Sequence, residues 1–268
     1  MLADSDTIPL LVVDGSHYEI GYKIGETFRE RIHLRIKLDL TLQTLFEFVK
    51  TDFCQQLYAE YVAAIRSVYP WYYDEMKGTS DGSQLSLDQI LCLNFQNETK
   101  MGLRRSKEKE NGSIGCSTVL LNRDNEYSIL HNEDASSSLF NVAYLIVATI
   151  NEQTYADQNF TCPKEKFISY CYAGTIPGNA FSANVHGLVF TLNGLYPNYL
   201  TRSKLPRQIM NRVLLSISTV DELDHLLSSQ PTAFGFSVNV GFYHQKRQRC
   251  LLNYEVGPKK DKDLGTLE

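Results

Sequence analysis

The stretch Asn111-Gly-Ser-Ile-Gly-Cys-Ser-Thr-Val-Leu-Leu-Asn122 divides the chain into two parts of different character. A polar, flexible run ends at Gly115, and an apolar segment typical of a β-strand begins at Cys116. A small residue with an unhindered carbonyl therefore directly precedes a thiol. In a strained turn that thiol can attack the preceding carbonyl and shift the acyl group from nitrogen to sulfur, after which water hydrolyses the thioester.

Such a cut would make Cys116 a new N-terminus. Its α-amine would then have a pKa of about 7.7–8.0 and could act as the general base for its own sulfur, so no separate histidine is needed. The alternative is a buried cysteine at the start of a core strand, because a free cysteine packs as a small hydrophobic side chain. The four residues 115–118 are by themselves a weak pattern, so other parts of the sequence have to decide between a catalytic and a structural cysteine.

The composition is that of a globular protein. The chain has 268 residues, of which 43% are hydrophobic, enough to bury a sizeable core in one domain with or without an added N-terminal segment. The net charge is −5, and no basic face or alternation of basic and aromatic residues invites nucleic acid or anionic lipid. We therefore expect a small molecule or a peptide as the substrate, and neither nucleic acid nor a membrane as a partner.

The cysteines favour neither a metal site nor a disulfide scaffold. They are spread along the chain without a Cys-x-x-Cys pair, at positions 54, 92, 116, 162, 171 and 250. We expect reduced thiols, no metal and no cofactor. No apolar run is long enough to span a bilayer, and the first residues lack the pattern of a signal peptide, so the expected location is the cytoplasm.

The first part of the chain begins with a predicted strand at 8–13. Ser16 and Glu19 then form a capping box for the helix that follows. In that helix Gly21 and Gly25 share one face. Because each glycine costs about 1 kcal/mol in a helix relative to alanine, the pair indicates that another backbone packs closely there.

The remainder of the first part is predicted to be mostly helical. Apolar periodicity predicts helices at 32–49, 53–68, 72–78 and 86–94, with Pro70 ending the second of them. The charged run at 100–112 is predicted to be a solvated loop that leads to the Gly115–Cys116 bond.

The second part of the chain is predicted to be rich in strands. We expect strands at 116–121, 127–131, 141–150, 166–172, 187–193, 236–244 and 249–256, with a turn at 122–125 and helices at 206–218 and 219–229. This order favours an antiparallel sheet covered by helices, which is an α+β fold. The far ends of paired strands lie together, so Asp134 or a neighbour can lie near Cys116.

Five short motifs occur in order along nearly the whole chain. They are Gly-Ser-His-Tyr-Glu-Ile-Gly-Tyr-Lys-Ile-Gly at 15–25, Gly-Cys-Ser-Thr at 115–118, His-Asn-Glu-Asp-Ala at 131–135, Cys-Tyr-Ala-Gly at 171–174 and His-Gly-Leu-Val-Phe at 186–190. In this combination the chain resembles the N-terminal-nucleophile (Ntn) hydrolases of the isopenicillin N acyltransferase type. The resemblance implies a four-layer αββα sandwich of two antiparallel sheets between helical layers. It also implies a precursor that cuts itself into a helical α-chain, residues 1–115, and a β-chain, residues 116–268, which stay associated.

The same resemblance implies roles for individual residues. Cys116 is the nucleophile, and the bond between Gly115 and Cys116 is the cleavage site. Asp134 is the acid that holds the freed amine, and Asn239 is the side-chain amide that stabilises the oxyanion. Further candidates for substrate or oxyanion contacts are Asn193, Gly174 and His131.

The implied activity is that of a cysteine amidohydrolase that cleaves small N-acyl amines, such as β-alanyl-dopamine or β-alanyl-histamine, through a thioester on Cys116. Two alternatives stay open. The first is an acyl-coenzyme A-dependent N-acyltransferase that uses the same residues. The second is a non-catalytic binding form, because members of the family continue past the equivalent of residue 268, and the strands that carry further catalytic contacts are expected to be missing here.

Overall fold

The computed structural model describes residues 7–105, 115–123, 126–155, 160–243 and 250–258. The helices are α1 (His17–Thr27), α2 (Arg29–Leu38), α3 (Leu40–Val49), α4 (Asp52–Val68), α5 (Pro70–Ser83), α6 (Leu87–Asn94), α7 (Gln96–Arg105), α8 (Arg207–Val213) and α9 (Val220–Ser229), with 3-10 turns η1 (Ser137–Leu139) and η3 (Leu214–Ser216). The strands are β1 (Leu10–Gly15), β2 (Ser117–Arg123), β3 (Glu126–Asn132), β4 (Ala143–Ile150), β5 (Gln153–Tyr155), β6 (Phe160–Cys162), β7 (Glu165–Tyr172), β8 (Asn179–Asn184), β9 (Leu188–Gly194), β10 (Phe236–Phe242) and β11 (Cys250–Val256).

The start of α1 is the capping box that the sequence predicts. The Glu19 backbone N–H donates to Ser16 Oγ, and the Ser16 backbone N–H donates to the Glu19 carboxylate at 2.8 Å. The prediction of one helix at 32–49 is wrong, because Asp39 divides it into α2 and α3. Asp39 Oδ1 accepts the backbone N–H groups of Thr41 and Leu42, and so caps the N-terminus of a new helix.

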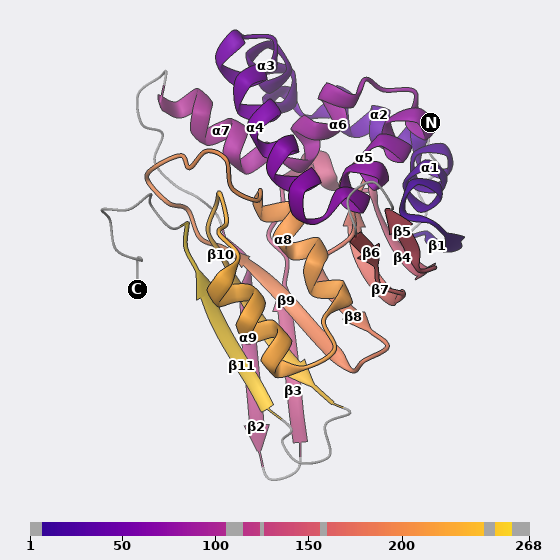
Figure 1. The fold of residues 1–268 in the computed structure, drawn as a ribbon, viewed down its shortest axis with the longest axis vertical. Coiled ribbons are helices and arrows are strands. Elements are labelled where there is room, and N and C mark those ends of the chain that lie inside the picture. The colour runs from indigo at the N-terminus through magenta and orange to yellow at the C-terminus, as the bar shows by residue number, and fades with distance from the viewer. Residues whose placement is uncertain (1–6, 106–114, 124–125, 156–159, 244–249, 259–268) are drawn as a thin grey trace.

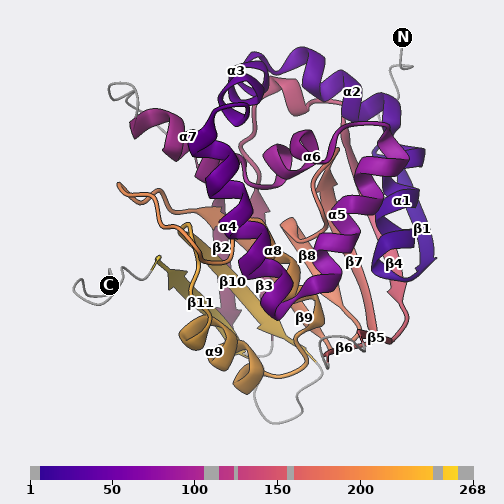
Figure 2. The same ribbon diagram turned by 45° about the horizontal axis from the view of Figure 1, so that its top comes forward.

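The glycine pair of α1 packs against a second glycine pair in α5. A Cβ on Gly21 would lie 1.9 Å from the backbone oxygen of Glu75, and a Cβ on Gly78 would lie 2.1 Å from that of Tyr18. The predicted close approach of another backbone is therefore confirmed. Figures 1 and 2 show the two helices side by side at one end of the molecule.

Two boundaries in the helical part differ from the prediction. Helix α4 ends before Pro70 as expected, but Pro70 is also the first residue of α5, where its missing N–H costs nothing. Helix α5 then runs through Gly78 to Ser83 and ends at Gln84, which has a φ of 61°. The charged segment is helical in α7 as far as Arg105, so the loop prediction is wrong for 100–105; residues 106–112 lie outside the described part.

No helix in the described ranges is long and apolar enough to cross a membrane.

The main sheet has seven strands in the order β1-β4-β7-β8-β9-β10-β11. Every pair from β4 to β11 is antiparallel, as the sequence predicts, whereas β1 pairs in parallel with β4, which was not predicted. The predicted strands all overlap observed ones, whereas the short strands β5, β6 and β8 were not predicted. Their brevity explains this, since three to six residues give little periodicity to detect.

The two faces of the sheet differ. In β10 the apolar side chains of Phe236, Val238 and Val240 alternate with Ser237 and Asn239, and all are buried. The apolar side lies under the helical layer that includes α8 and α9 (Figure 1). The polar side faces the β2–β3 hairpin, which lies across β9 and β10. The fold class is therefore α+β, as predicted, with helices, a sheet and a hairpin in successive layers.

Candidate active site

Cys116 lies directly before β2 and is half-buried. In the β2–β3 ladder Ser117 pairs with Asn132, so continuing the same register places Cys116 opposite Glu133. The thiol donates to Glu133 Oε2 at 2.9 Å and lies 3.9 Å from the backbone oxygen of Asp134. The hairpin thus brings an acid to the thiol, as the pattern predicts, and the carboxylate that touches the sulfur is that of Glu133.

Glu133 is the centre of a small hydrogen-bond network. Its Oε1 accepts the hydroxyl of Tyr172, and its Oε2 lies 2.9 Å from Nε2 of His131. On the other side of the imidazole ring, Nδ1 of His131 lies 2.9 Å from the hydroxyl of Thr118. These contacts fix the carboxylate in one orientation, with one oxygen turned towards the sulfur of Cys116.

The network also sets the protonation of the thiol. Burial, together with the neighbouring Glu133 carboxylate, raises the pKa of Cys116 to about 12. Burial would raise the pKa of Glu133 as well, but the hydrogen bonds from His131, Cys116 and Tyr172 outweigh it and hold that pKa below its ordinary value. At neutral pH the pair is therefore a protonated thiol beside an ionised carboxylate, which is the starting state for proton transfer from sulfur to Glu133.

A row of asparagines holds the backbone of the candidate nucleophile. Asn193 of β9 donates from Nδ2 to the carbonyl oxygen of Cys116 at 2.6 Å. Its Oδ1 accepts from Thr118 at 3.0 Å and from Nδ2 of Asn239 at 2.8 Å, and Asn253 of β11 donates in turn to Asn239. Since a carbonyl can only accept, the amide nitrogen of Asn193 has to face Cys116, and the row is ordered from that point outward.

The structure places the predicted site residues at different distances from the thiol. His131 and Asn193 contact the Cys116–Glu133 group directly, whereas Asn239 is one hydrogen bond further away. The carboxylate of Asp134 accepts from Asn132 at 2.7 Å and lines the same pocket as Cys116.

Gly115 and Gly174 have opposite surroundings. Gly115 is exposed, and a Cβ there would meet no atom of the described residues within 4 Å, so the described part of the chain leaves space beside this residue. Gly174 has a φ of +88°, and a Cβ would lie 2.4 Å from Leu93 Cδ1; its carbonyl accepts from Asn94 at 3.2 Å. Gly174 therefore shapes a tightly packed loop, and it is not brought to the thiol.

A pocket of about 300 Å³ opens beside Cys116. Its wall includes Glu133, Asp134, Tyr172 and Arg207. Pockets of this size suit small molecules with a few polar anchoring groups. The site can therefore present a thiol, an adjacent proton acceptor and several hydrogen-bond donors to a small ligand.

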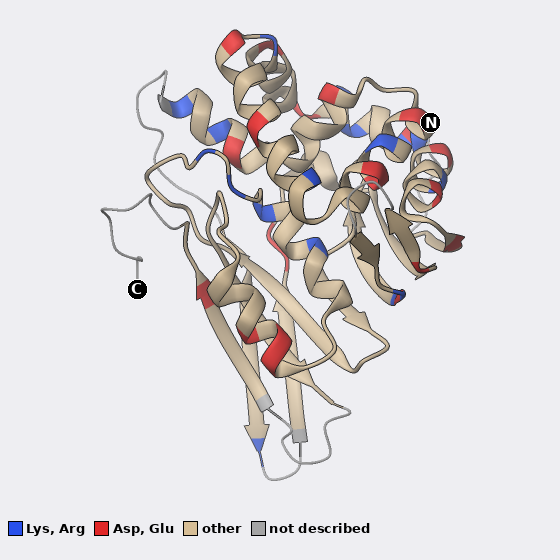
Figure 3. Ribbon diagram, viewed as in Figure 1, with Lys and Arg blue, Asp and Glu red and all other residues tan. Residues whose placement is uncertain are grey.

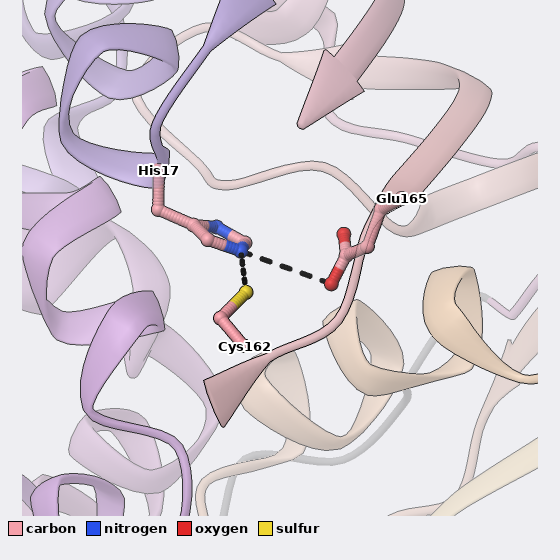
Figure 4. A group of neighbouring side chains, drawn as sticks. All are labelled: His17, Cys162 and Glu165. Atoms are coloured by element: carbon pink, nitrogen blue, oxygen red, sulfur yellow. Dashed lines mark hydrogen bonds and ion pairs between the residues drawn. The ribbon is translucent and has the colours of Figure 1, made fainter. Parts of the chain in front are cut away.

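Two groups of side chains in the described residues could each offer three ligand atoms to a metal ion. One is Cys116, His131 and Glu133 in the site itself. The other is His17, Cys162 and Glu165, drawn in Figure 4, where His17 Nε2 lies 3.1 Å from the sulfur and 3.8 Å from Glu165 Oε1.

The second group is part of an enclosed ion-pair network. His17 Nδ1 lies 2.6 Å from Glu75, and Arg212 binds Glu165 at 2.7 Å and Glu75 at 3.0 Å. All these side chains are fully buried. Both oxygens of Glu165 already accept hydrogen bonds, one from Arg212 and one from the Tyr72 hydroxyl. The network therefore links α1, α5, β7 and α8 within the core.

Sequence reasoning did not single out Glu133, Tyr172 or Arg207. For Glu133 a signal was present, because the register of the hairpin follows from the centre of its turn. The other two had no local signal. Tyr172 comes from β7 and Arg207 from the start of α8, and only the folded chain brings them to Cys116.

Comparison with known proteins finds a matching family and a relative. The model of the family described as acyl-coenzyme A:6-aminopenicillanic acid acyl-transferase matches residues 121–263. A relative from Drosophila melanogaster, the beta-alanyl-dopamine/carcinine hydrolase, is 31% identical over 265 residues, which is 98% of this chain and 68% of that protein.

The fold and these similarities support an enzyme of the amide hydrolase and acyltransferase class. Within that class, the chain belongs to the acyl-coenzyme A:6-aminopenicillanic acid acyl-transferase family. The resemblance recognised in its motifs is thereby confirmed.

Proposed function

We propose that the protein is a self-processing cysteine amidohydrolase that cleaves small N-acyl amines. The observation that carries this proposal is the contact between the Cys116 thiol and the Glu133 carboxylate at the wall of a small pocket. The thiol directly follows Gly115, which is exposed.

The first step is the cut before Cys116. Glu133 accepts the thiol proton, and the sulfur attacks the Gly115 carbonyl. The bond between the Gly115 carbonyl and the Cys116 nitrogen breaks, that nitrogen takes the proton, and water hydrolyses the resulting thioester. The products are a chain that ends at Gly115 and a chain that begins with the free amine of Cys116.

In the second reaction the new N-terminus acts on a substrate amide. The α-amine of Cys116 accepts the thiol proton, the sulfur attacks the acyl carbonyl, and the amine product leaves after taking that proton. Water then hydrolyses the thioester, which releases the acid and restores the thiol. Asp134, which lines the pocket beside Cys116, holds the α-amine. The oxyanion donor is a side-chain amide of the asparagine row. Asn239 is the residue that the family resemblance implies, and Asn193, which accepts from Asn239 at 2.8 Å, is the second candidate.

The proposed substrates are small amides of the β-alanyl type. Support comes from the relative whose name gives β-alanyl-dopamine and carcinine, which is β-alanyl-histamine, as its substrates. A pocket of about 300 Å³ has room for molecules of this size.

A second candidate is transfer of the acyl group to or from coenzyme A. It is favoured by the description of the family as an acyl-transferase. The same thioester on Cys116 would form, and an amine or a thiol would replace water as the acceptor.

The test has two stages. Intact mass measurement of the purified wild type should give two fragments that divide between Gly115 and Cys116. Cys116→Ala should stay as one chain, and Ser117→Ala, a control at the exposed neighbouring position, should be cut like the wild type. The cut protein should then release the amine from β-alanyl-histamine without coenzyme A. A wild type that stays uncut and releases no amine would leave only the non-catalytic binding form.

A further inference from the structure

The pocket beside Cys116 carries three basic side chains without a carboxylate partner. They are Arg35, Lys100 and Arg207, and none forms an ion pair within 4.0 Å with any described residue. They come from α2, α7 and α8, which are far apart in the sequence. Figure 3 shows basic positions on α7 and at the first turn of α8, and these two elements touch where the Arg207 backbone N–H donates to Glu98 at 2.7 Å.

Arg35 is the most enclosed of the three. Only 2% of its surface is exposed, yet its Nε has no hydrogen-bond partner among the described residues, and its Nη1 donates to the Ala173 carbonyl at 2.7 Å. Burial lowers the pKa of Arg35 to about 10, and the guanidinium stays charged at neutral pH. A buried charged donor without an acceptor is costly unless a ligand supplies one.

Arg207 and Lys100 are similarly short of acceptors. With the described residues the Arg207 guanidinium makes one long hydrogen bond, from Nη2 to the Asn193 carbonyl at 3.5 Å. Burial lowers the pKa of Arg207 and that of Lys100, which means that their charges are poorly solvated where they are.

Three carboxylates line the same pocket, and the charge of Asp39 favours the charged forms of Arg35 and Lys100, although neither forms an ion pair with it. Asp39 accepts two backbone N–H groups as the cap of α3, and Asp134 accepts from Asn132. Glu133 is taken by Cys116, His131 and Tyr172. The wall of the pocket therefore holds three cationic side chains without an ion-pair partner among the described residues, beside three carboxylates that accept hydrogen bonds from other groups.

We propose that this pocket binds a carboxylate of the substrate, so that the preferred substrates are amides that carry a carboxylate group. This inference rests on the proposed amide hydrolysis and narrows its substrate class. The carboxylate can belong to the amine portion, as in a β-alanyl amino acid, or to the acyl portion, as in a half-amide of a dicarboxylic acid. Guanidinium groups suit this task because their N–H pairs match the two oxygens of a carboxylate.

Matched pairs of substrates test the inference. β-Alanyl-histidine differs from β-alanyl-histamine only by a carboxylate on the amine portion, and succinyl-histamine differs from it by a carboxylate in place of the acyl ammonium. With the processed wild type, at least one carboxylate amide should have a kcat/KM about tenfold or more above that of β-alanyl-histamine, because charge-assisted hydrogen bonds are strong. The pair that shows the gain identifies the side of the substrate that meets the basic residues.

Variants test whether the higher kcat/KM of the carboxylate amides depends on the basic residues of the pocket. Arg207→Gln and Lys100→Gln should reduce the advantage of the carboxylate amide and leave β-alanyl-histamine less affected. Arg202→Gln is a matched control, because that arginine already pairs with Glu60 away from the pocket. Equal or lower kcat/KM for both carboxylate amides would overturn the inference while leaving the amide hydrolysis intact.

If no amide is cleaved, the proposed amide hydrolysis is refuted, but the proposed binding of a carboxylate is not. A measurement of binding then tests the carboxylate site by itself. Site-specific alkylation of Cys116 by iodoacetamide, followed by peptide mass spectrometry, reports occupancy of the pocket without turnover. The carboxylate amides should protect Cys116 at lower concentrations than β-alanyl-histamine. Equal protection by all three compounds would overturn the inference.

Discussion

Replacing Glu133 with glutamine removes the carboxylate that touches the Cys116 sulfur. With a thiol pKa of about 12, only about one molecule in 10⁵ carries a thiolate at pH 7. The cut before Cys116 therefore depends on a base that takes the proton during attack, and Glu133 Oε2 lies 2.9 Å away. Loss of a general base typically costs about 10²–10⁴ in rate, so Glu133→Gln should slow processing by roughly that factor.

The assay is a time course of cell-free synthesis, in which the conversion of the full chain into two fragments is followed on a denaturing gel. Asp134→Asn is the matched control, because the Asp134 carboxylate bonds to Asn132 and only its backbone oxygen lies near the sulfur. It should change the rate of processing by less than about tenfold, since the carboxylate that touches the sulfur, Glu133, is retained. Processing of Glu133→Gln at the wild-type rate, or a larger defect in Asp134→Asn, would refute the role given to Glu133.

Three further changes concern stability and are measured by urea denaturation. Gly21→Ala drives a Cβ into the backbone of α5 and should lower the free energy of unfolding by about 3 kcal/mol or more. Gly102→Ala in α7 meets only the rings of Phe48 at 3.3 Å and Phe53 at 3.4 Å, and should cost less than about 1 kcal/mol. Arg212→Met leaves two buried carboxylates without their counter-charge and should cost about 3–5 kcal/mol. Burial raises the pKa of Glu98 to about 7, so the folded chain binds this proton more tightly than the unfolded one. Between pH 4.5 and pH 7 the free energy of unfolding of the wild type should therefore fall by about 3 kcal/mol relative to that of Glu98→Gln. Parallel pH profiles of stability would contradict the raised pKa of Glu98.

Local signals in the sequence predicted the fold well where the chain itself specifies the structure. The capping box at Ser16 and the glycines at 21 and 25 were informative because hydrogen bonds and steric space act over a few residues. The break at Asp39 was missed, because the apolar periodicity continues across it and a capping side chain is hard to distinguish from a surface acid.

The residues that surround Cys116 could be predicted from local sequence signals only in part. A turn centred on 122–125 places Cys116 opposite His131, whereas the observed pairing of Arg123 with Glu126 moves the centre by one residue and the partner by two, to Glu133. A small error in a turn therefore changes which acid meets the thiol. The basic residues of the pocket come from three separate helices, so only tertiary packing relates them to Cys116.

Strand β1 belongs to the part of the chain before Gly115, yet it lies at the end of the main sheet and pairs in parallel with β4 along its whole length. Scission before Cys116 would therefore yield two polypeptides that share one sheet and one core. Their folding equilibrium would become bimolecular, with a stability that depends on protein concentration. Dilution after denaturation should then hinder reassembly of the cut form, whereas an uncut variant should refold equally well at any concentration.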